Sequence, residues 1–295
     1  MIASSLKPNG IIGICSPSHI ADREKYKVMI EAIQENGYRV LEADNLYKTT
    51  YGYMSAPQER AADFNQLIAN PEVELVLFGG GECSNELIPY IDFESIRKNP
   101  KLICSYSDGT TILNTIWANT GLEVYYGQTP AVFEGFSGYN YENFQRHLVQ
   151  GDAKEHIAGS PWLVQTEGTA EGILIGGYSR NVALLLGSKY FPVDLSKKYL
   201  LFIEDHEKFG GVDYVSAMLS SIEQNDFIHN VTGLLFGHYS EKIYPDLLNR
   251  LKRFGEEHQI PVVYCDDFGH GANRGILRIG HPAKLDTADK SLRYL

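Results

Sequence analysis

The sequence lacks the features of a nucleic-acid-binding or membrane-spanning protein. Its 26 Lys and Arg residues are outnumbered by 37 Asp and Glu residues, for a net charge of −11, and no local run of basic residues compensates for this. Neutralising phosphates requires basic residues, so we expect no nucleic acid partner. No apolar run approaches the roughly 18 residues of a membrane span, and residues 1–10 do not resemble a signal peptide. The sequence therefore predicts a cytoplasmic protein without a membrane partner.

Cysteine is also scarce, and the four cysteines lie far apart, at Cys15, Cys83, Cys104 and Cys265. They form no C-x-x-C pair and have no histidine beside them at metal-ligand spacing. We therefore expect neither a disulfide framework nor a structural metal site. Three of them end short apolar runs, where cysteine usually acts as a small buried hydrophobe. Cys83 differs, because it follows three glycines.

The sequence does contain enough apolar residues, 43% of 295, to form one large domain or two medium ones. Short apolar runs alternate with amphipathic segments in the first half. The predicted strands are residues 11–15, 38–41, 73–78 and 102–106, and the predicted helices are residues 22–36, 57–69 and 108–118. This alternation is typical of a parallel sheet covered on both faces, so the first half is predicted to be a doubly wound α/β domain.

The second half predicts another, less regular α/β domain. Its predicted strands are residues 172–175, 199–203, 231–236 and 262–265, and its predicted helices are residues 181–186, 212–224 and 244–258. Residues 133–169 are rich in Gly, Tyr, Asn and charged residues without a sustained period, so we expect this segment to cross between domains. The predicted division is a first domain over residues 1–135, a linker over 136–168 and a second domain over 169–295.

Residues that directly follow strands are the candidate site residues, because ligands of parallel sheets bind beyond the carboxyl ends of the strands. The strand ending at Phe78 continues as GGGECSN over residues 79–85. Glycines here would let the backbone approach a ligand and would present N–H groups at a helix start. The same residues could also form a plain tight turn.

Three further strand ends carry candidate catalytic groups. Ser107 stands at a sharp strand-to-helix step, where it is either a nucleophile or a helix cap. Glu204 directly follows a strand and either orients a histidine or belongs to a solvated acidic loop. His270 lies between two glycines after a strand, as an accessible base or as an ordinary loop histidine. Together they supply the side-chain types of a catalytic triad.

At these same points the chain resembles the LD-carboxypeptidase family of serine peptidases, which includes the immunity proteins that cleave microcin C. The resemblance runs from about residue 10 to residue 285. The matching motifs, in order, are Pro17-Ser18, RAAD at 60–63, Gly80-Gly81, LIPYID at 87–92, NPK at 99–101, SYSDGT at 105–110, Gly176-Gly177, Glu204-Asp205 and Gly269-His270.

The resemblance implies a role for each candidate. Ser107 is then the nucleophile, His270 the base and Glu204 its partner, and N–H groups at Gly81 and Asp108 form the oxyanion hole. It also implies a flavodoxin-like amino-terminal domain, a smaller carboxyl-terminal domain that carries the glutamate and the histidine, and a homodimer. Two departures stand out. Ser105 replaces the family's glycine two residues before the nucleophile, and Glu82-Cys83 stand where Tyr-Gly is common.

We therefore expect a serine hydrolase that cleaves an amide bond next to a terminal carboxylate or similar anionic group, through an acyl-enzyme and without metal or cofactor. The substrate is a small peptide, such as a murein tetrapeptide, or an aminoacyl nucleotide analogue. Ser84 and Asn85 are closer to the microcin-immunity branch of the family. The expected substrate-binding residues are Gly80, Ser84, Asn85, Trp162 as a stacking aromatic, and Arg180 and Arg274 as partners of the anion. The alternative for Trp162 is that it simply packs between the domains.

Two alternatives remain open from the sequence. A cysteine amidase would use Cys83 with His270, because a thiolate at a glycine-rich helix start is activated. A non-catalytic binding module would use the same strand ends to hold a small ligand.

Overall fold

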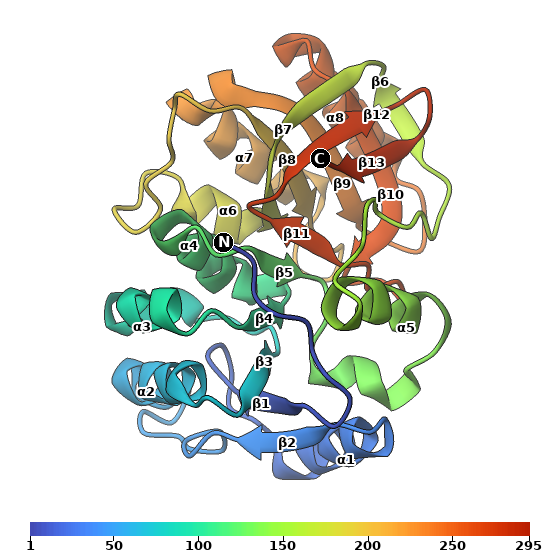
Figure 1. The fold of residues 1–295 in the computed structure, drawn as a ribbon. Helices are drawn as coiled ribbons and strands as arrows, with labels where there is room; N and C mark the ends of the chain where they lie inside the picture. Colours follow the sequence, from blue (N-terminus) through green and yellow to red (C-terminus); the bar gives the residue numbers. More distant parts are fainter. The chain divides into compact units, whose positions relative to one another are not determined.

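The computed structural model describes residues 1–295 and divides them into two compact units (Figure 1). Unit 1 comprises Met1–Asp152 and unit 2 comprises Ala153–Leu295. None of the helices combines the length and the apolar composition that crossing a membrane would require.

Unit 1 is built on a parallel sheet. Its strands are β1 (Ile11–Cys15), β2 (Arg39–Glu42), β3 (Val73–Phe78), β4 (Leu102–Ser105) and β5 (Val124–Tyr126). They pair in the order β5-β4-β3-β1-β2, and every pair is parallel. β1 and β4 are buried along their whole length, as the uninterrupted apolar runs predict.

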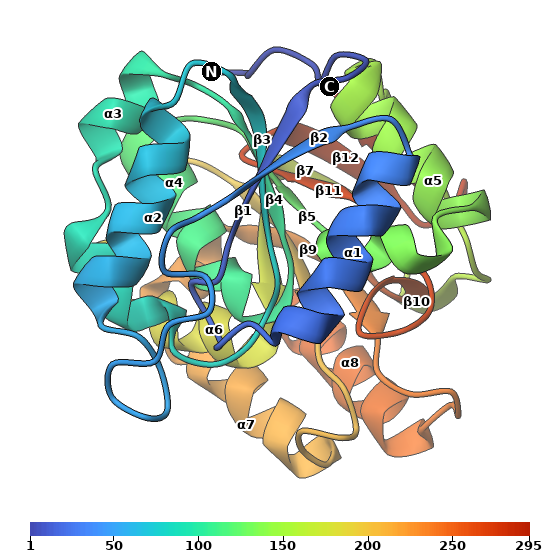
Figure 2. The same cartoon turned by 90° about the horizontal axis from the view of Figure 1, so that it is seen from below.

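Helices cover both faces of this sheet, as Figure 2 shows, with α2, α3 and α4 on one side and α1 and α5 on the other. Their bounds are α1 (Arg23–Glu35), α2 (Pro57–Ala69), α3 (Phe93–Lys98), α4 (Thr110–Thr120) and α5 (Gly138–Phe144). Asp22 caps α1 by accepting from the Lys25 N–H at 2.9 Å, and Pro57 opens α2 where no backbone donor is needed. The predicted doubly wound α/β arrangement is confirmed.

Unit 2 contains a seven-stranded mixed sheet in the order β13-β12-β7-β8-β9-β10-β6. The central strands β7 to β10 are mutually parallel, whereas β6, β12 and β13 are antiparallel to their neighbours. The bounds of its strands are β6 (Leu163–Thr166), β7 (Thr169–Tyr178), β8 (Tyr199–Glu204), β9 (Val231–His238), β10 (Val262–Gly269), β12 (Pro282–Asp286) and β13 (Ser291–Tyr294). A further strand of this unit, β11 (Leu277–Ile279), lies outside this sheet. Helices α6 (Ser179–Leu185), α7 (Val212–Glu223) and α8 (Pro245–His258) pack side by side.

The structure differs from the expectation of an irregular crossing over residues 133–169. Residues up to Asp152 belong to unit 1 and include α5, whereas β6 is an edge strand of the unit 2 sheet. Aromatic packing explains the first part, because the Phe136 and Phe144 rings contact each other and both contact Phe133. Such a cluster forms without the regular spacing that a periodicity analysis detects.

Arg60 on α2 joins three loops of unit 1 from a fully buried position. Its guanidinium donates to the carbonyl oxygens of Ser55 at 3.1 Å, Pro17 at 2.6 Å and Cys83 at 3.0 Å, and it also pairs with the Glu86 carboxylate. Two of these loops follow the carboxyl ends of β1 and β3, and the loop after β3 is one of the strand ends where the sequence predicts functional residues. Arg60 therefore fixes the backbone around the candidate site.

Replacing Arg60 with methionine should lower the free energy of unfolding by about 3 kcal/mol or more, because buried carbonyls and a carboxylate lose their donor. Denaturant unfolding measures this change. Lys48→Met is the matched control, since it removes an ion pair to Glu59 whose lysine side chain is 51% exposed. The control should cost at most about 1 kcal/mol. Equal losses in the two variants would contradict the role assigned to Arg60.

Candidate active site

Ser107 occupies a strained backbone position directly beyond β4. Its φ of +54° lies in the left-handed region that non-glycine residues rarely adopt. A short 3-10 turn, Ser107–Gly109, follows and leads into α4, so the helix begins two residues later than the sequence predicts. Strain of this kind costs about 1–3 kcal/mol and occurs preferentially at functional sites, including the nucleophile turn of α/β hydrolases.

The hydroxyl of Tyr126, at the end of β5, helps to hold this conformation. It accepts a hydrogen bond from the Ser107 N–H at 3.0 Å. The Ser107 side chain itself is 7% exposed.

Ser105, the residue that departs from the family pattern, has a structural role. Its side chain is fully buried, and Oγ donates to the Phe78 carbonyl at 2.8 Å, which joins the ends of β4 and β3. A Cβ on Gly109 would lie 2.2 Å from this oxygen, so Gly109 makes room for the serine. The departure therefore changes the support of the turn and leaves the conformation of Ser107 intact.

The glycine segment after β3 approaches Ser107 closely. A Cβ on Gly80 would lie 2.7 Å from Ser107 Cβ, and a Cβ on Gly81 would lie 2.1 Å from the Ser18 carbonyl oxygen. Gly81 also has a φ of +152°. The backbone at Gly80 thus lies next to the candidate nucleophile, and a side chain at Gly80 would meet Ser107 whereas one at Gly81 would meet Ser18.

Asp108 and Ser84 are tied together beside this segment. The Ser84 N–H donates to Asp108 Oδ2, and Ser84 Oγ donates to the Asp108 carbonyl, both at 2.8 Å. Ser84 is fully buried, so its polar groups act within unit 1. The next residue, Asn85, is exposed and remains a candidate for substrate contact.

His19 is a residue of this region that the sequence analysis missed. Its Nδ1 lies 2.8 Å from the Gly80 carbonyl oxygen, and its Nε2 lies 2.8 Å from the Tyr26 hydroxyl. Since a carbonyl only accepts, Nδ1 carries the proton and Nε2 accepts from Tyr26. Burial lowers the pKa of His19, which favours this neutral form. The sequence signal that could have identified His19 as a site residue is its position beyond a predicted strand, two residues after Pro17.

Cys83 lies in the same loop with a thiol that is not activated. Burial, followed by the nearby Glu86 and Asp108 carboxylates, raises the pKa of this thiol. Nucleophilic cysteines have lowered pKa values, so this environment argues against a cysteine amidase. The other three cysteines are buried and free, as their apolar surroundings predict.

In unit 2, Glu204 and His270 form a hydrogen-bonded pair at the ends of β8 and β10. His270 Nδ1 lies 2.8 Å from Glu204 Oε2, and the glutamate is fully buried. A carboxylate accepts, so Nδ1 carries the proton and Nε2 remains the basic nitrogen. Gly269, with a φ of +103°, allows the approach, because its Cβ would lie 2.9 Å from Glu204 Oε2.

Polar and aromatic groups surround this pair within unit 2. Burial raises the pKa of Asp205 to about 6, although its carboxylate accepts from the Ser179 hydroxyl and the His206 N–H. The Phe209 ring lies 5.0 Å from the His270 ring, centroid to centroid, and the Tyr178 ring lies 5.6 Å away. Phe209 is 53% exposed, so an accessible aromatic surface adjoins His270. The sequence analysis missed it.

The predicted anion partners lie close to these elements. Arg274 Nη1 donates to the Gly269 carbonyl at 2.8 Å and so supports the turn before His270. The Arg180 guanidinium lies 5.4 Å from the Tyr178 ring centroid. Lys208, an exposed cation in the loop after Glu204, is a further candidate that the sequence analysis did not single out.

Trp162 is 3% exposed and is held inside unit 2. Its indole N–H donates to Asp267 Oδ2 at 2.7 Å, and the same carboxylate accepts from His156, Gly159 and Ser160. Burial alone would raise the pKa of Asp267, but the hydrogen bonds from His156, Ser160 and Trp162 outweigh it and lower the pKa. Stacking on a substrate would require this buried ring to become accessible.

Comparison with known proteins identifies the family. The sequence model of the LD-carboxypeptidase N-terminal domain matches residues 12–127, and that of the C-terminal domain matches residues 171–285. Among relatives, a Treponema pallidum protein to which carboxypeptidase activity is ascribed is 30% identical over 90% of this chain and 86% of that protein. The Microcin C7 self-immunity protein MccF of Escherichia coli is 26% identical over 99% of this chain and 95% of that protein.

Solved structures agree with this result. An MccF-like protein from Bacillus anthracis superposes with a TM-score of 0.89 at 26% identity, covering 100% of this chain and 99% of that one. The MccF structure in complex with aspartyl sulfamoyl adenosine has a TM-score of 0.86 at 25% identity, covering 100% of this chain and 98% of that one. The chain belongs to the LD-carboxypeptidase family and is a serine carboxypeptidase-type hydrolase.

Proposed function

We propose that this hydrolase works through a Ser107, His270 and Glu204 triad. The proposal rests on the geometry of two groups. Ser107 has a strained backbone conformation beyond β4, and the buried Glu204 carboxylate orients the His270 imidazole. Ser107 Oγ attacks the carbonyl carbon of the scissile amide and passes its proton to His270 Nε2. The buried Glu204 carboxylate stabilises the resulting imidazolium.

The remaining steps follow from the same groups. N–H groups of Gly81 and Asp108 hold the oxyanion, and the carbon–nitrogen bond breaks as His270 returns the proton to the leaving nitrogen. Water then attacks the acyl-enzyme and gives a proton to His270. The ester bond to Ser107 breaks as His270 returns this proton to Oγ, which releases the carboxylic acid and restores Ser107. The position of Gly80 supports the oxyanion hole proposed beside Ser107, because this backbone lies so close that a side chain on Gly80 would meet Ser107.

We further propose that the substrate is a small aminoacyl-nucleotide-like compound with an anionic group near the scissile bond. The support is the full-length similarity to MccF, whose solved structures include complexes with aspartyl sulfamoyl adenosine and with AMP. Arg180, Arg274 and Lys208 are the candidate partners of the anion. Asn85 and the backbone at Gly80 are the proposed contacts in unit 1.

Two aromatic side chains are candidates for binding the base of such a substrate. Phe209 is exposed and adjoins His270, which favours it. Trp162 stays a candidate only if its loop opens, because its N–H is bound to Asp267 and its ring is buried.

We also propose that the protein acts in the cytoplasm as a homodimer. Its four free cysteines suit a reducing compartment, and the homodimer is the arrangement that the family resemblance implies.

The first prediction concerns the nucleophile. Ser107→Ala should fold normally and lose hydrolysis by a factor on the order of 10^4 or more, because the covalent route disappears. Cys83→Ala is the matched control and should keep most of its activity. Labelling with a fluorophosphonate, read by peptide mass, should mark Ser107 in the wild type. An inactive Cys83 variant beside an active Ser107 variant would establish the cysteine amidase instead.

The second prediction concerns pH. The value of kcat/KM should rise with pH, because only a neutral His270 accepts the proton of Ser107. Glu204→Gln should lower kcat by a factor on the order of 10^2 or more, since the imidazolium loses its carboxylate, while thermal unfolding shows that the variant is folded. A profile that is flat from pH 5 to pH 9 would remove His270 as the base.

The third prediction concerns the substrate. Phe209→Ala should lower kcat/KM for an aminoacyl-adenylate analogue by roughly 5-fold or more, since stacking on a base is worth about 1–3 kcal/mol. The same change should barely affect a murein tetrapeptide, which has no base. Trp162→Ala is assayed with the same two substrates and by thermal unfolding. A lower kcat/KM for the adenylate alone indicates lost stacking, whereas a lower melting temperature indicates loss of the hydrogen bond to Asp267. A wild-type preference for the tetrapeptide, without turnover of the adenylate, rejects the nucleotide substrate.

A further inference from the structure

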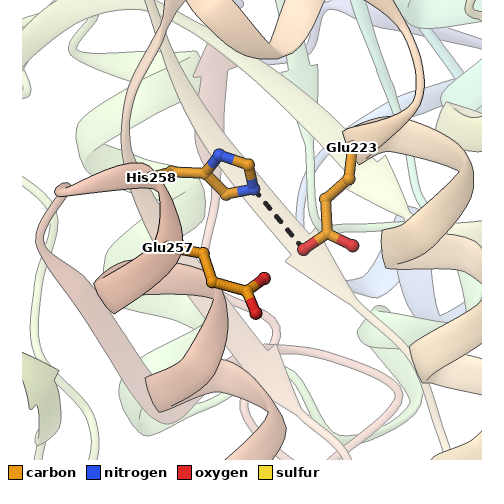
Figure 3. A group of neighbouring side chains, drawn as sticks. All are labelled: Glu223, Glu257 and His258. Atoms are coloured by element: carbon orange, nitrogen blue, oxygen red, sulfur yellow. Dashed lines mark ion pairs between the residues drawn. The ribbon is translucent and has the colours of Figure 1, made fainter.

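Three potential metal ligands that the hydrolysis does not use lie together at the ends of two helices of unit 2 (Figure 3). Glu223 is the last residue of α7, and Glu257 and His258 are the last two residues of α8. One ligand atom of each residue lies within 4.8 Å of the other two. Figure 3 shows the imidazole of His258 directed at the Glu223 carboxylate, with the Glu257 carboxylate beside them.

Two of these ligand atoms are buried and make no hydrogen bond. Glu223 Oε1 and His258 Nε2 have no hydrogen-bond partner, and they lie 3.5 Å apart. That separation is longer than a good N–H to O hydrogen bond. Buried polar atoms are normally satisfied, so the space that these two atoms share calls for a binding partner.

The separation of the two atoms suits a single metal ion. With metal–ligand bonds of about 2.1 Å, two ligands 3.5 Å apart subtend an angle of about 113° at the metal, close to the tetrahedral angle. The Glu257 side chain is 55% exposed and can adjust to supply a third ligand. A water molecule would complete the tetrahedron from the solvent side.

Neighbouring side chains orient Glu223 and His258. Arg250 Nη2 donates to Glu223 Oε2 at 2.7 Å, so the other oxygen of this carboxylate is directed to His258. The Phe254 ring contacts the His258 ring at a centroid distance of 4.8 Å and limits its rotation. Partners of this kind, outside the ligands themselves, are usual around metal sites. The contact of Glu257 with Arg253, at 3.7 Å between two exposed side chains, is weak enough to give way.

We propose that Glu223, Glu257 and His258 bind a divalent transition-metal ion, with Zn²⁺ as the best fit, and that the ion links the ends of α7 and α8. An imidazole nitrogen with two carboxylates suits zinc, whereas Mg²⁺ prefers six oxygen ligands in an octahedron. The ion stabilises unit 2, because it binds the folded arrangement of the two helices. The site shares no residue with the proposed triad of Ser107, Glu204 and His270, so the inference does not depend on the proposed mechanism.

Zinc binding to the chelator-treated full chain tests the proposal. Isothermal titration with ZnCl₂ should find one more site of high affinity in the wild type than in His258→Gln, or an affinity at least tenfold higher. Glu256→Gln is the matched control, because it removes an acidic side chain from the same helix that pairs only with Lys252 at the surface. This control should bind zinc like the wild type.

Two independent readouts accompany the titration. Zn²⁺ should raise the melting temperature of the wild type and of Glu256→Gln but not of His258→Gln, and Mg²⁺ should raise none of them. Co²⁺ in place of Zn²⁺ should give the visible absorption of a tetrahedral ion in the wild type and in Glu256→Gln but not in His258→Gln. All three metal-free proteins should have the same kcat/KM.

Other histidines of unit 2 could bind zinc as well, so the difference between the variants decides the outcome. Equal zinc stoichiometry and affinity in the wild type and His258→Gln would overturn the proposal. Absence of zinc binding to the wild type at micromolar concentration would also overturn it and would leave Glu223 and His258 as an ion pair.

Discussion

The left-handed backbone of Ser107 is the constraint on which the structure of the unit 1 site depends. A serine with a φ of +54° is unfavourable by about 1–3 kcal/mol, so its surroundings must hold it there. The Tyr126 hydroxyl binds its N–H, and Ser105 fastens the preceding strand to β3. Each such bond contributes about 0.5–1.5 kcal/mol, and together they offset the strain.

The same principle governs the loops around that turn. Ser84 holds Asp108 through two hydrogen bonds, His19 holds the Gly80 carbonyl, and Arg60 joins the loops beyond β1 and β3. These side chains are buried or nearly so, and a buried polar group without its partner is costly. Buried hydrogen bonds therefore hold the loops at this edge of the sheet beside Ser107, and glycines occur where the backbones come closest.

Unit 2 uses buried carboxylates in a similar way. Glu204 orients His270, and Asp267, only three residues before His270, gathers donors from His156 and Trp162. Both acids lie within or at the end of a central strand and have no access to water, so hydrogen bonds determine their orientation. The Glu223 cluster is different in kind, because two of its atoms face each other without a hydrogen bond.

The sequence by itself determined the doubly wound first half and the strand ends that carry Ser107, Glu204 and His270. Uninterrupted apolar runs, helical periodicity and glycines after strands depend on local order along the chain, so β3 and α2 were predicted with the bounds that the structure has. Family motifs then supplied the roles.

Only the tertiary structure decided which distant side chains meet. The contact of Asp267 with Trp162 spans 105 residues, and the contact between Arg60 and the Cys83 carbonyl spans 23. His19 and Phe209 were missed for the same reason, because packing between segments leaves no periodic trace in the sequence, and the sequence left open whether Trp162 packs or stacks on a substrate. The antiparallel strands β6, β12 and β13 were likewise unpredicted, since strands near the margin of a sheet are short and partly exposed. Sequence order specifies which residues follow each strand, whereas burial and hydrogen bonding between strands determine what those residues contact.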